Sequence, residues 1–256
     1  MKTIIGENYY AGIKDELTIY QSDNNIFEAL DEFILKYKKH HKLFFISYDL
    51  KNKIEVLSSN NKDKINFPLI KCIVPEKIKP KNEFFNQDMG TNKPLFFDPE
   101  INKKEYISII EKIKSHIQKG DIYETNFCYE WGANQKIPNP YLLYKKLEEL
   151  TKAPFSVYAE FDDHVIISAS PERFLKKRGA HLISEPIKGT SKRSKIKKED
   201  IKLINQLKND PKERTENIMI VDLVRNDLSK IANENSVKVD ELCKVYSFEN
   251  IHQMIS

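Results

Sequence analysis

The segment Asp210–Leu228 constrains the fold more than any other part of this sequence. Asp210 can cap a helix, Pro211 suits the first helical turn, and Glu213 completes the pattern of a capping box. The predicted helix is densely apolar from Ile218 to Val224, so we expect it to be largely buried. Charged side chains on the same helix are costly to bury unless they are paired or bound to a cation. The helix is therefore a place to look for a functional site.

The composition is that of a globular protein. The chain has 256 residues, 40% of them apolar, which suffices for one large domain or two smaller ones. The net charge of +4 is the small difference between 42 basic and 38 acidic residues. The basic run Lys188–Lys198 contains no aromatic residue, so it fits a solvated mobile loop better than a nucleic-acid site. We expect no nucleic-acid partner.

The cysteines and the apolar runs bear on the compartment. Cys72, Cys128 and Cys243 are widely spaced and odd in number, which favours a reducing cytoplasm. The first residues do not form a signal peptide, and no apolar run approaches the length of a membrane span. We expect a soluble, cytoplasmic protein without a membrane partner.

Hydrophobic periodicity predicts a mixture of strands and helices in two parts, residues 1–100 and 101–256. The first part shows short apolar pieces typical of strands, among them 43–48, 53–57 and 69–74, with one helix over 26–37. It ends in the connector 75–99, which lacks periodicity.

The second part has stronger local signals. A helix is expected from Asn102 to a C-cap at Gly120, and another after Asn139-Pro140. Alternation predicts a strand with one polar line of side chains over 121–131. It also predicts two strand pairs: 155–161 with 164–168, joined at Asp162-Asp163, and 173–176 with 181–186.

Taken singly, the polar residues in these segments are ordinary. Glu172 beside Arg173 is typical of a surface ion pair, and Lys188 of a solvated lysine. Four segments together are more specific: Gly120–Phe127, Pro154–Leu175, Pro186–Thr190 (PIKGT) and Asp210–Leu228. In this order and spacing they resemble the chorismate-using enzymes that include anthranilate synthase and aminodeoxychorismate synthase, and they look most like the latter.

The resemblance implies an α+β fold, layered and sheet-rich with outer helices, built from two similar halves. Only the first half would be present, so residues 101–256 would be an incomplete catalytic domain. The resemblance also implies a general acid at Glu172 and a Mg²⁺ ligand at Glu216, with a second carboxylate expected farther along the family's chain. A carboxyl group is an acid near neutral pH only where its surroundings favour the protonated form.

Lys188 is the residue that discriminates between products. Anthranilate-forming members usually have PIAGT, whereas the aminodeoxychorismate enzymes have PIKGT with a nucleophilic lysine, which must be neutral to react. The resemblance thus implies amination of chorismate at C4, in para-aminobenzoate and folate biosynthesis. The ammonia would come from a glutamine amidotransferase subunit.

Further residues follow from the same resemblance. Gly189, Thr190 and His252 match positions that bind the substrate. Glu124 departs from the family, which has glutamine there in amine-transferring members and lysine in isochorismate-forming members, so isochorismate chemistry is disfavoured. Two alternatives remain open: an anthranilate synthase component I, which Lys188 disfavours, and a non-catalytic chorismate-binding remnant.

Overall fold

The structure is a computed structural model that describes residues 1–59, 61–84, 93–161 and 164–256. The chain forms two compact units, one of Met1–Phe85 with Tyr144–Ser256 and one of Asn86–Leu143. Compactness alone does not define an independently folding domain, so the expected division at residue 100 stays a prediction. The predicted turn at Asp162-Asp163 and part of the predicted connector lie outside the described residues.

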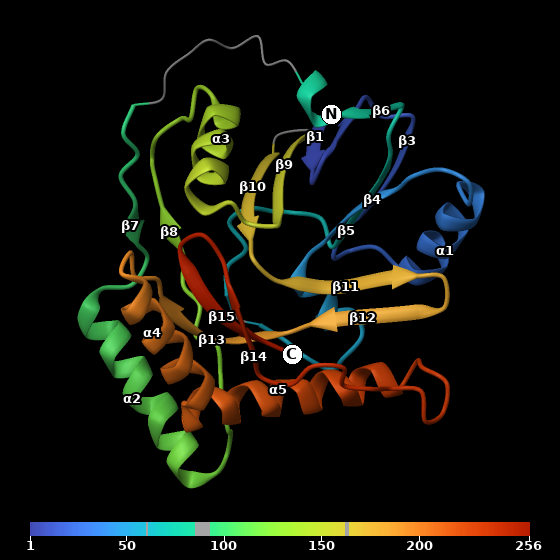
Figure 1. The fold of residues 1–256 in the computed structure, drawn as a ribbon. Helices are drawn as coiled ribbons and strands as arrows, with labels where there is room; N and C mark the ends of the chain where they lie inside the picture. Colours follow the sequence, from blue (N-terminus) through green and yellow to red (C-terminus); the bar gives the residue numbers. More distant parts are fainter. Residues whose placement is uncertain (60, 85–92, 162–163) are drawn as a thin grey trace. The chain divides into compact units, whose positions relative to one another are not determined.

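Two antiparallel sheets are built largely from the N-terminal part of the first unit (Figure 1). The larger has the strand order β10-β9-β1-β2-β6, with bounds His164–Ser170, Phe155–Phe161, Lys2–Ile5, Asn8–Ala11 and Lys77–Pro80. The smaller has the order β3-β5-β4, with bounds Asp15–Ile19, Ile70–Val74 and Leu43–Ile46.

An apolar cluster joins these two sheets. Leu43 and Ile73 from the smaller sheet pack with Ala159 and Phe161 from the larger one, and all four are buried. This burial of apolar surface is the main favourable term that holds the sheets together.

Two further sheets carry the C-terminal signature segments. The strands β11 (Arg173–Arg178) and β12 (His181–Glu185) form a hairpin, which confirms that predicted pair. The other sheet has the order β13-β15-β14, with bounds Ile187–Lys192, Ile251–Ile255 and Lys244–Ser247. The pairing of β9 with β10 confirms the other predicted strand pair, 155–161 with 164–168.

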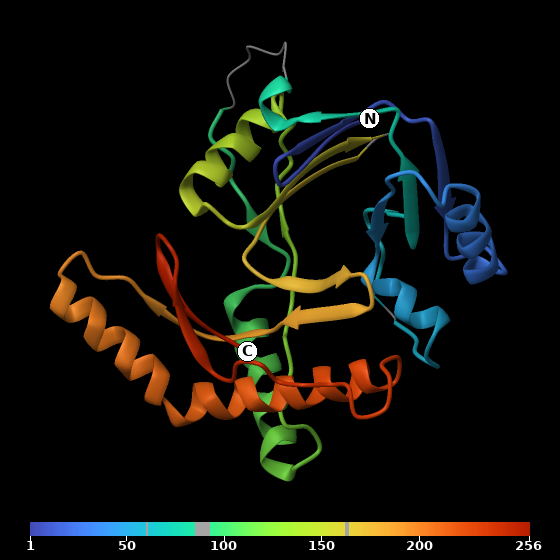
Figure 2. The same ribbon diagram turned by 45° about the vertical axis from the view of Figure 1, so that its right-hand side comes forward.

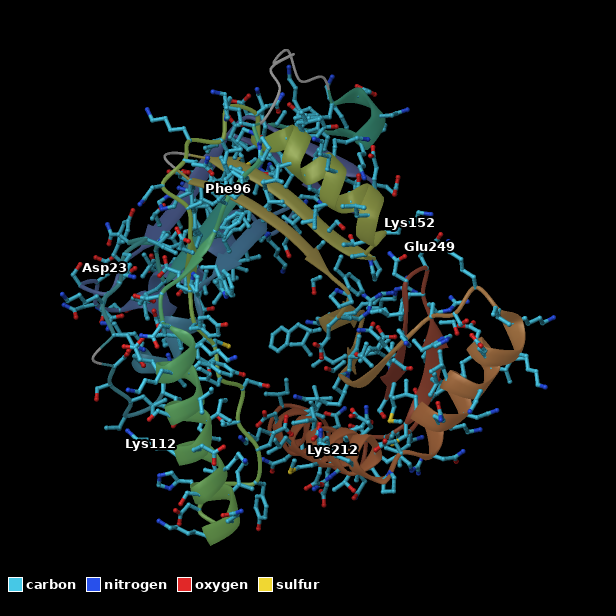
Figure 3. The ribbon with its side chains drawn as sticks, turned by 90° about the vertical axis from the view of Figure 1, so that its left-hand side faces the viewer. Asp23, Phe96, Lys112, Lys152, Lys212 and Glu249 are labelled. Carbon is cyan, nitrogen blue, oxygen red and sulfur yellow. The ribbon has the colours of Figure 1, made fainter. Side chains whose placement is uncertain are left out.

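The helices of the first unit are seen together in Figure 2. Their bounds are α1 Ile26–Lys36, α4 Lys197–Asn209 and α5 Pro211–Ser229, with short 3-10 turns η1 Tyr48–Lys53 and η2 Lys81–Glu83. Helix α3 (Pro140–Thr151) leads back into this unit. After it, Lys152 lies 3.2 Å from Glu249 in the β14–β15 turn, and the two side chains point toward one another in Figure 3.

Helix α5 begins as predicted but differs in two respects. Asp210 caps it by accepting from the main-chain N–H groups of Lys212 and Glu213. The capping box is not completed, because the Asp210 N–H donates to Leu207 O instead. The expectation that the helix is largely buried was wrong: all its residues are described, and only Asn217 is buried, while Ile218 and Leu223 are exposed.

The basic run was also interpreted wrongly as a mobile loop. Its first half is strand β13, paired with β15, and its end begins helix α4. A predicted strand at 53–57 is not formed: Lys53 ends η1, and residues 54–57 have no strand partner among the described residues.

The second unit contains helix α2 (Lys103–Lys119), which the sequence located correctly. Asn102 and Glu105 form a complete capping box, and Gly120 ends the helix with a φ of 79°. The strand predicted over 121–131 is reduced to β8 (Trp131–Gly132), paired with β7 (Asp98–Pro99). The mixture of helices and antiparallel sheets confirms the α+β class. No helix in the described part of the chain is long and apolar enough to span a membrane.

Candidate active site

Glu172 is held in contact with the first residue of β13. Its Oε1 accepts a hydrogen bond of 3.0 Å from the main-chain N–H of Ile187. Ser170 shapes the turn that presents it, because the Glu172 N–H donates to Ser170 Oγ at 3.3 Å. The predicted acid, Glu172, is therefore hydrogen-bonded to the residue that directly precedes the predicted nucleophile, Lys188.

Lys188 and Gly189 occupy an irregular stretch of β13. The pairing with β15 is regular at Thr190 and beyond but shifts between Ile187 and Thr190. Such irregularities re-aim side chains and are frequent beside active sites. Gly189 has a φ of 90°, and a Cβ there would lie 3.1 Å from Glu213 Oε2, so both conformation and space favour glycine.

Glu216 lies one turn after Glu213 on α5, and both side chains are largely covered. Lys212 Nζ lies 3.4 Å from Glu216 Oε1 and 3.9 Å from Glu213 Oε1; Figure 3 shows Lys212 on this helix. The hydrogen bond with Glu216 raises the pKa of Lys212. Because Lys212 is mostly exposed, the pair is readily rearranged when another cation approaches.

Asn217 joins three segments and was not anticipated from the sequence. Its Nδ2 donates to Met254 O at 3.2 Å and, at a longer 3.5 Å, to Lys188 O. Its Oδ1 accepts from Ser256 Oγ and from Cys243 Sγ. The buried amide therefore fixes α5 against β13 and β15 beside the predicted site residues.

His252 is fully buried in β15. One ring nitrogen lies 2.9 Å from Asp200 Oδ1 and the other 2.8 Å from Ser247 Oγ. Two nitrogens of Arg193 donate hydrogen bonds to the Asp200 carboxyl group. These bonds, together with one from the Ser194 N–H, hold the pKa of the Asp200 carboxyl well below its usual range. Both nitrogens of His252 have protein partners, and its predicted contact with a substrate stays untested.

Thr190 and Glu124 are the remaining residues that the sequence singled out. Thr190 is exposed on β13, opposite Gln253 of β15. Glu124 belongs to the second unit, in the irregular segment between α2 and β8, and its role stays untested.

A groove of about 560 Å³ borders these residues within the first unit. Its walls are mainly apolar and come from the start of β9, β11, β12, the C-terminal half of α5 and the C-terminal strands. They include Phe155, Arg173, Ile183, Val224, Tyr246 and Ile255. The volume is within the range of pockets that hold small molecules. Arg173, which follows Glu172, and Ile187, which precedes Lys188, both belong to its wall.

The carboxylates of Glu213 and Glu216 on α5 are the donor type that a hard divalent cation prefers, but they are fewer than a complete set of ligands. Mg²⁺ is bound through oxygen atoms, commonly by one or two carboxylates together with waters and substrate oxygens. Glu216 and Glu213, one turn apart and largely covered, match that donor type. No group of three or more acidic, histidine or cysteine side chains with metal-binding geometry occurs among the described residues.

A model of the protein family described as chorismate binding enzyme matches residues 4–256. The chain belongs to this family. Two Bacillus subtilis members are similar to it: aminodeoxychorismate synthase component 1, 37% identical over 147 residues, and anthranilate synthase component 1, 36% identical over 154 residues. These matches cover 57% and 60% of this chain but only 31% and 30% of the relatives. The chain thus spans about a third of the length of these chorismate binding enzymes.

Solved structures of the family confirm the fold. Anthranilate synthase component I from Streptococcus pneumoniae superposes with a TM-score of 0.81 at 20% identity, covering 99% of this chain and 69% of that one. A structure described as a putative isochorismate synthase, DhbC from Bacillus anthracis, gives a TM-score of 0.68 at 18% identity, covering 99% and 65%. The chain therefore has an anthranilate synthase component I-like fold. The identities to an aminodeoxychorismate synthase component and to an anthranilate synthase component are nearly equal, so sequence identity does not distinguish between these two reactions.

Proposed function

We propose that this chain is the chorismate-binding component of an aminodeoxychorismate synthase, which replaces the C4 hydroxyl of chorismate with an amino group. The observation that carries the proposal is the 3.0 Å hydrogen bond from the Ile187 N–H to Glu172 Oε1. It brings a carboxyl group to Ile187, the residue that directly precedes the only lysine of the PIKGT segment. An acid next to an amine suits a reaction in which a hydroxyl leaves while a nucleophile enters the ring.

The proposed steps balance without an oxidant. The neutral amine of Lys188 adds to C2 while Glu172 protonates the C4 hydroxyl, which leaves as water as both double bonds of the ring diene shift. Ammonia then adds at C4 and returns a proton to Glu172, both double bonds shift back, and the amine of Lys188 leaves C2. The enolpyruvyl group is retained, and the net change is chorismate plus ammonia giving 4-amino-4-deoxychorismate plus water.

Other residues of the site would bind and orient the substrate. The main-chain N–H of Gly189 and the exposed hydroxyl of Thr190 would donate hydrogen bonds to a substrate carboxylate. Glu216, with Glu213 beside it, would hold Mg²⁺. When bound, the ion would neutralise substrate carboxylate charge.

We further propose that ammonia comes from a glutamine amidotransferase subunit and that the product serves folate biosynthesis. The designation of similar proteins as component 1 supports the existence of a second component. Anthranilate synthesis is the alternative, favoured by the 36% identity to an anthranilate synthase and disfavoured by Lys188. A non-catalytic chorismate-binding role is the third possibility.

Product analysis distinguishes these functions. The protein is incubated with chorismate, Mg²⁺ and an ammonium salt, with and without a glutamine amidotransferase subunit and glutamine. We expect a non-fluorescent product with the mass of aminodeoxychorismate. Anthranilate fluorescence without that mass would contradict the proposal, and binding of chorismate without turnover would support the non-catalytic role.

A further inference from the structure

Gln253 faces the opposite side of its sheet from His252. β15 is the central strand between β13 and β14, and successive side chains of a strand alternate between faces. His252 contacts Asp200 and Met254 packs on Leu207, so both face helix α4. Gln253 therefore faces the other way, with Thr190 and Tyr246 as its cross-strand neighbours.

The side chain of Gln253 is buried, and its Oε1 accepts no hydrogen bond from the described residues. The residue is only 6% exposed. Buried polar groups in folded proteins are nearly always hydrogen-bonded, so an exception requires a physical explanation. Asn217 provides the contrast, because both polar atoms of its side-chain amide have partners.

The position of this oxygen relates it to the candidate site. Thr190, directly across the strand pair from Gln253, lies two residues after Lys188. Side chains directly opposite in an antiparallel pair have Cβ atoms about 5 Å apart. The unpaired oxygen is thus adjacent to the strand that carries the predicted nucleophile and, through Ile187, holds the predicted acid.

We propose that Gln253 is a ligand-binding residue of this site, whose Oε1 accepts a hydrogen bond from the ring hydroxyl of a chorismate-class ligand. An amide oxygen accepts and does not donate, so its partner must be an O–H or N–H group rather than a carboxylate. The ligand class rests on the proposed function. The assignment of Gln253, rather than the neighbouring His252, rests on the strand alternation and the unpaired oxygen.

The substitution Gln253→Met tests this inference through two measurements. Methionine has a similar length and no strong hydrogen-bonding group, so the variant removes the buried unpaired oxygen. The unfolding temperature of the ligand-free variant should equal or exceed that of the wild type. Its affinity for chorismate, measured by calorimetry, should fall about tenfold, the worth of one hydrogen bond to a buried acceptor. Gln206→Met makes the same chemical change on an exposed position of α4 and should alter neither quantity.

The outcomes separate this inference from the proposed function. If wild type and Gln253→Met bind chorismate equally well, Gln253 is not a ligand residue, and the proposed function is unaffected. A lower unfolding temperature of ligand-free Gln253→Met would show a protein partner for the oxygen and also overturn the inference. Absence of chorismate binding by the wild type would overturn both. Should the variant not fold, the side-chain amide NMR signals of Gln253 in the wild type must shift on adding chorismate, and unchanged signals overturn the inference.

Discussion

The main-chain N–H of Ile187 donates to the side-chain Oε1 of Glu172, and this contact brings two segments 15 residues apart into one site. The acceptor carboxyl group is exposed, and the donor residue is followed directly by Lys188. The geometry yields testable consequences for each partner.

Replacing Glu172 by glutamine should reduce kcat by a factor of about 10² to 10⁴ while KM changes little. The glutamine oxygen can still accept from the Ile187 N–H, so the structure should be kept while the acid is lost. Steady-state kinetics of amination measures the effect. Glu149→Gln, on the exposed side of α3, serves as the control, and a Glu172→Gln variant as active as that control would remove Glu172 from the mechanism.

Replacing Lys188 by alanine should abolish amination at C4, because alanine has no amine to form the proposed bond with C2 of the ring. Chorismate consumption and both possible products are followed by mass spectrometry and fluorescence. Lys192→Ala, at the exposed end of the same strand, should retain activity. Unaltered amination by Lys188→Ala would contradict a nucleophilic role.

Replacing Asn217 by alanine should lower the free energy of unfolding by about 1–3 kcal/mol, since buried hydrogen-bonding groups lose their partner. The carbonyl of Met254 and the side chains of Cys243 and Ser256 are affected. Urea unfolding monitored by circular dichroism provides the value. Asn205→Ala, an exposed position on α4, should change it by less than about 0.5 kcal/mol. Equal effects of the two substitutions would mean that Asn217 does not tie the strands to α5.

The stability of the first unit should decrease in acid through Asp15. Hydrogen bonds from Tyr37 and then Lys36 lower its pKa to about 2. A carboxyl whose pKa is lower in the folded state stabilises the protein fully above its unfolded pKa of about 3.9, and that contribution is lost as the pH falls through the folded value. Between about pH 4 and 2, Asp15→Asn should therefore show a weaker pH dependence of the unfolding midpoint than the wild type. Asp31→Asn, at an exposed position on α1, should behave as the wild type does; the same slope in all three proteins would refute the assignment.

The sequence predicts those elements whose signals are local. Asn102 with Glu105 starts α2 and Gly120 ends it, because caps satisfy main-chain groups within a few residues. Strand β13 was missed because its partner, β15, lies about 60 residues later, and its basic residues imitate a solvated loop. Helix α4 has no side-chain cap at Ile196 and gave no start signal.

The sequence proposed the site residues, whose roles stay predictions, but not how their segments meet. The family-like segments pointed to Glu172, Lys188 and Glu216, and the contacts of Ile187 and Asn217 bring the segments of Glu172 and Glu216 to β13. The family resemblance selected His252, but the sequence could not show which face of the sheet His252 and Gln253 occupy, because a shift of one residue along a strand moves a side chain to the other face. Only the contact of His252 with Asp200 reveals which face each residue takes.

The covalent step at Lys188 is the central claim, and mass spectrometry of the protein tests it most directly. The protein is mixed with chorismate and Mg²⁺ in the absence of ammonia, quenched rapidly and digested. The account predicts an adduct on the peptide that contains Lys188, with the mass of chorismate less one water, and its loss when ammonia is added before quenching. Aminodeoxychorismate formation without any such adduct, or the same adduct in Lys188→Ala, would contradict it.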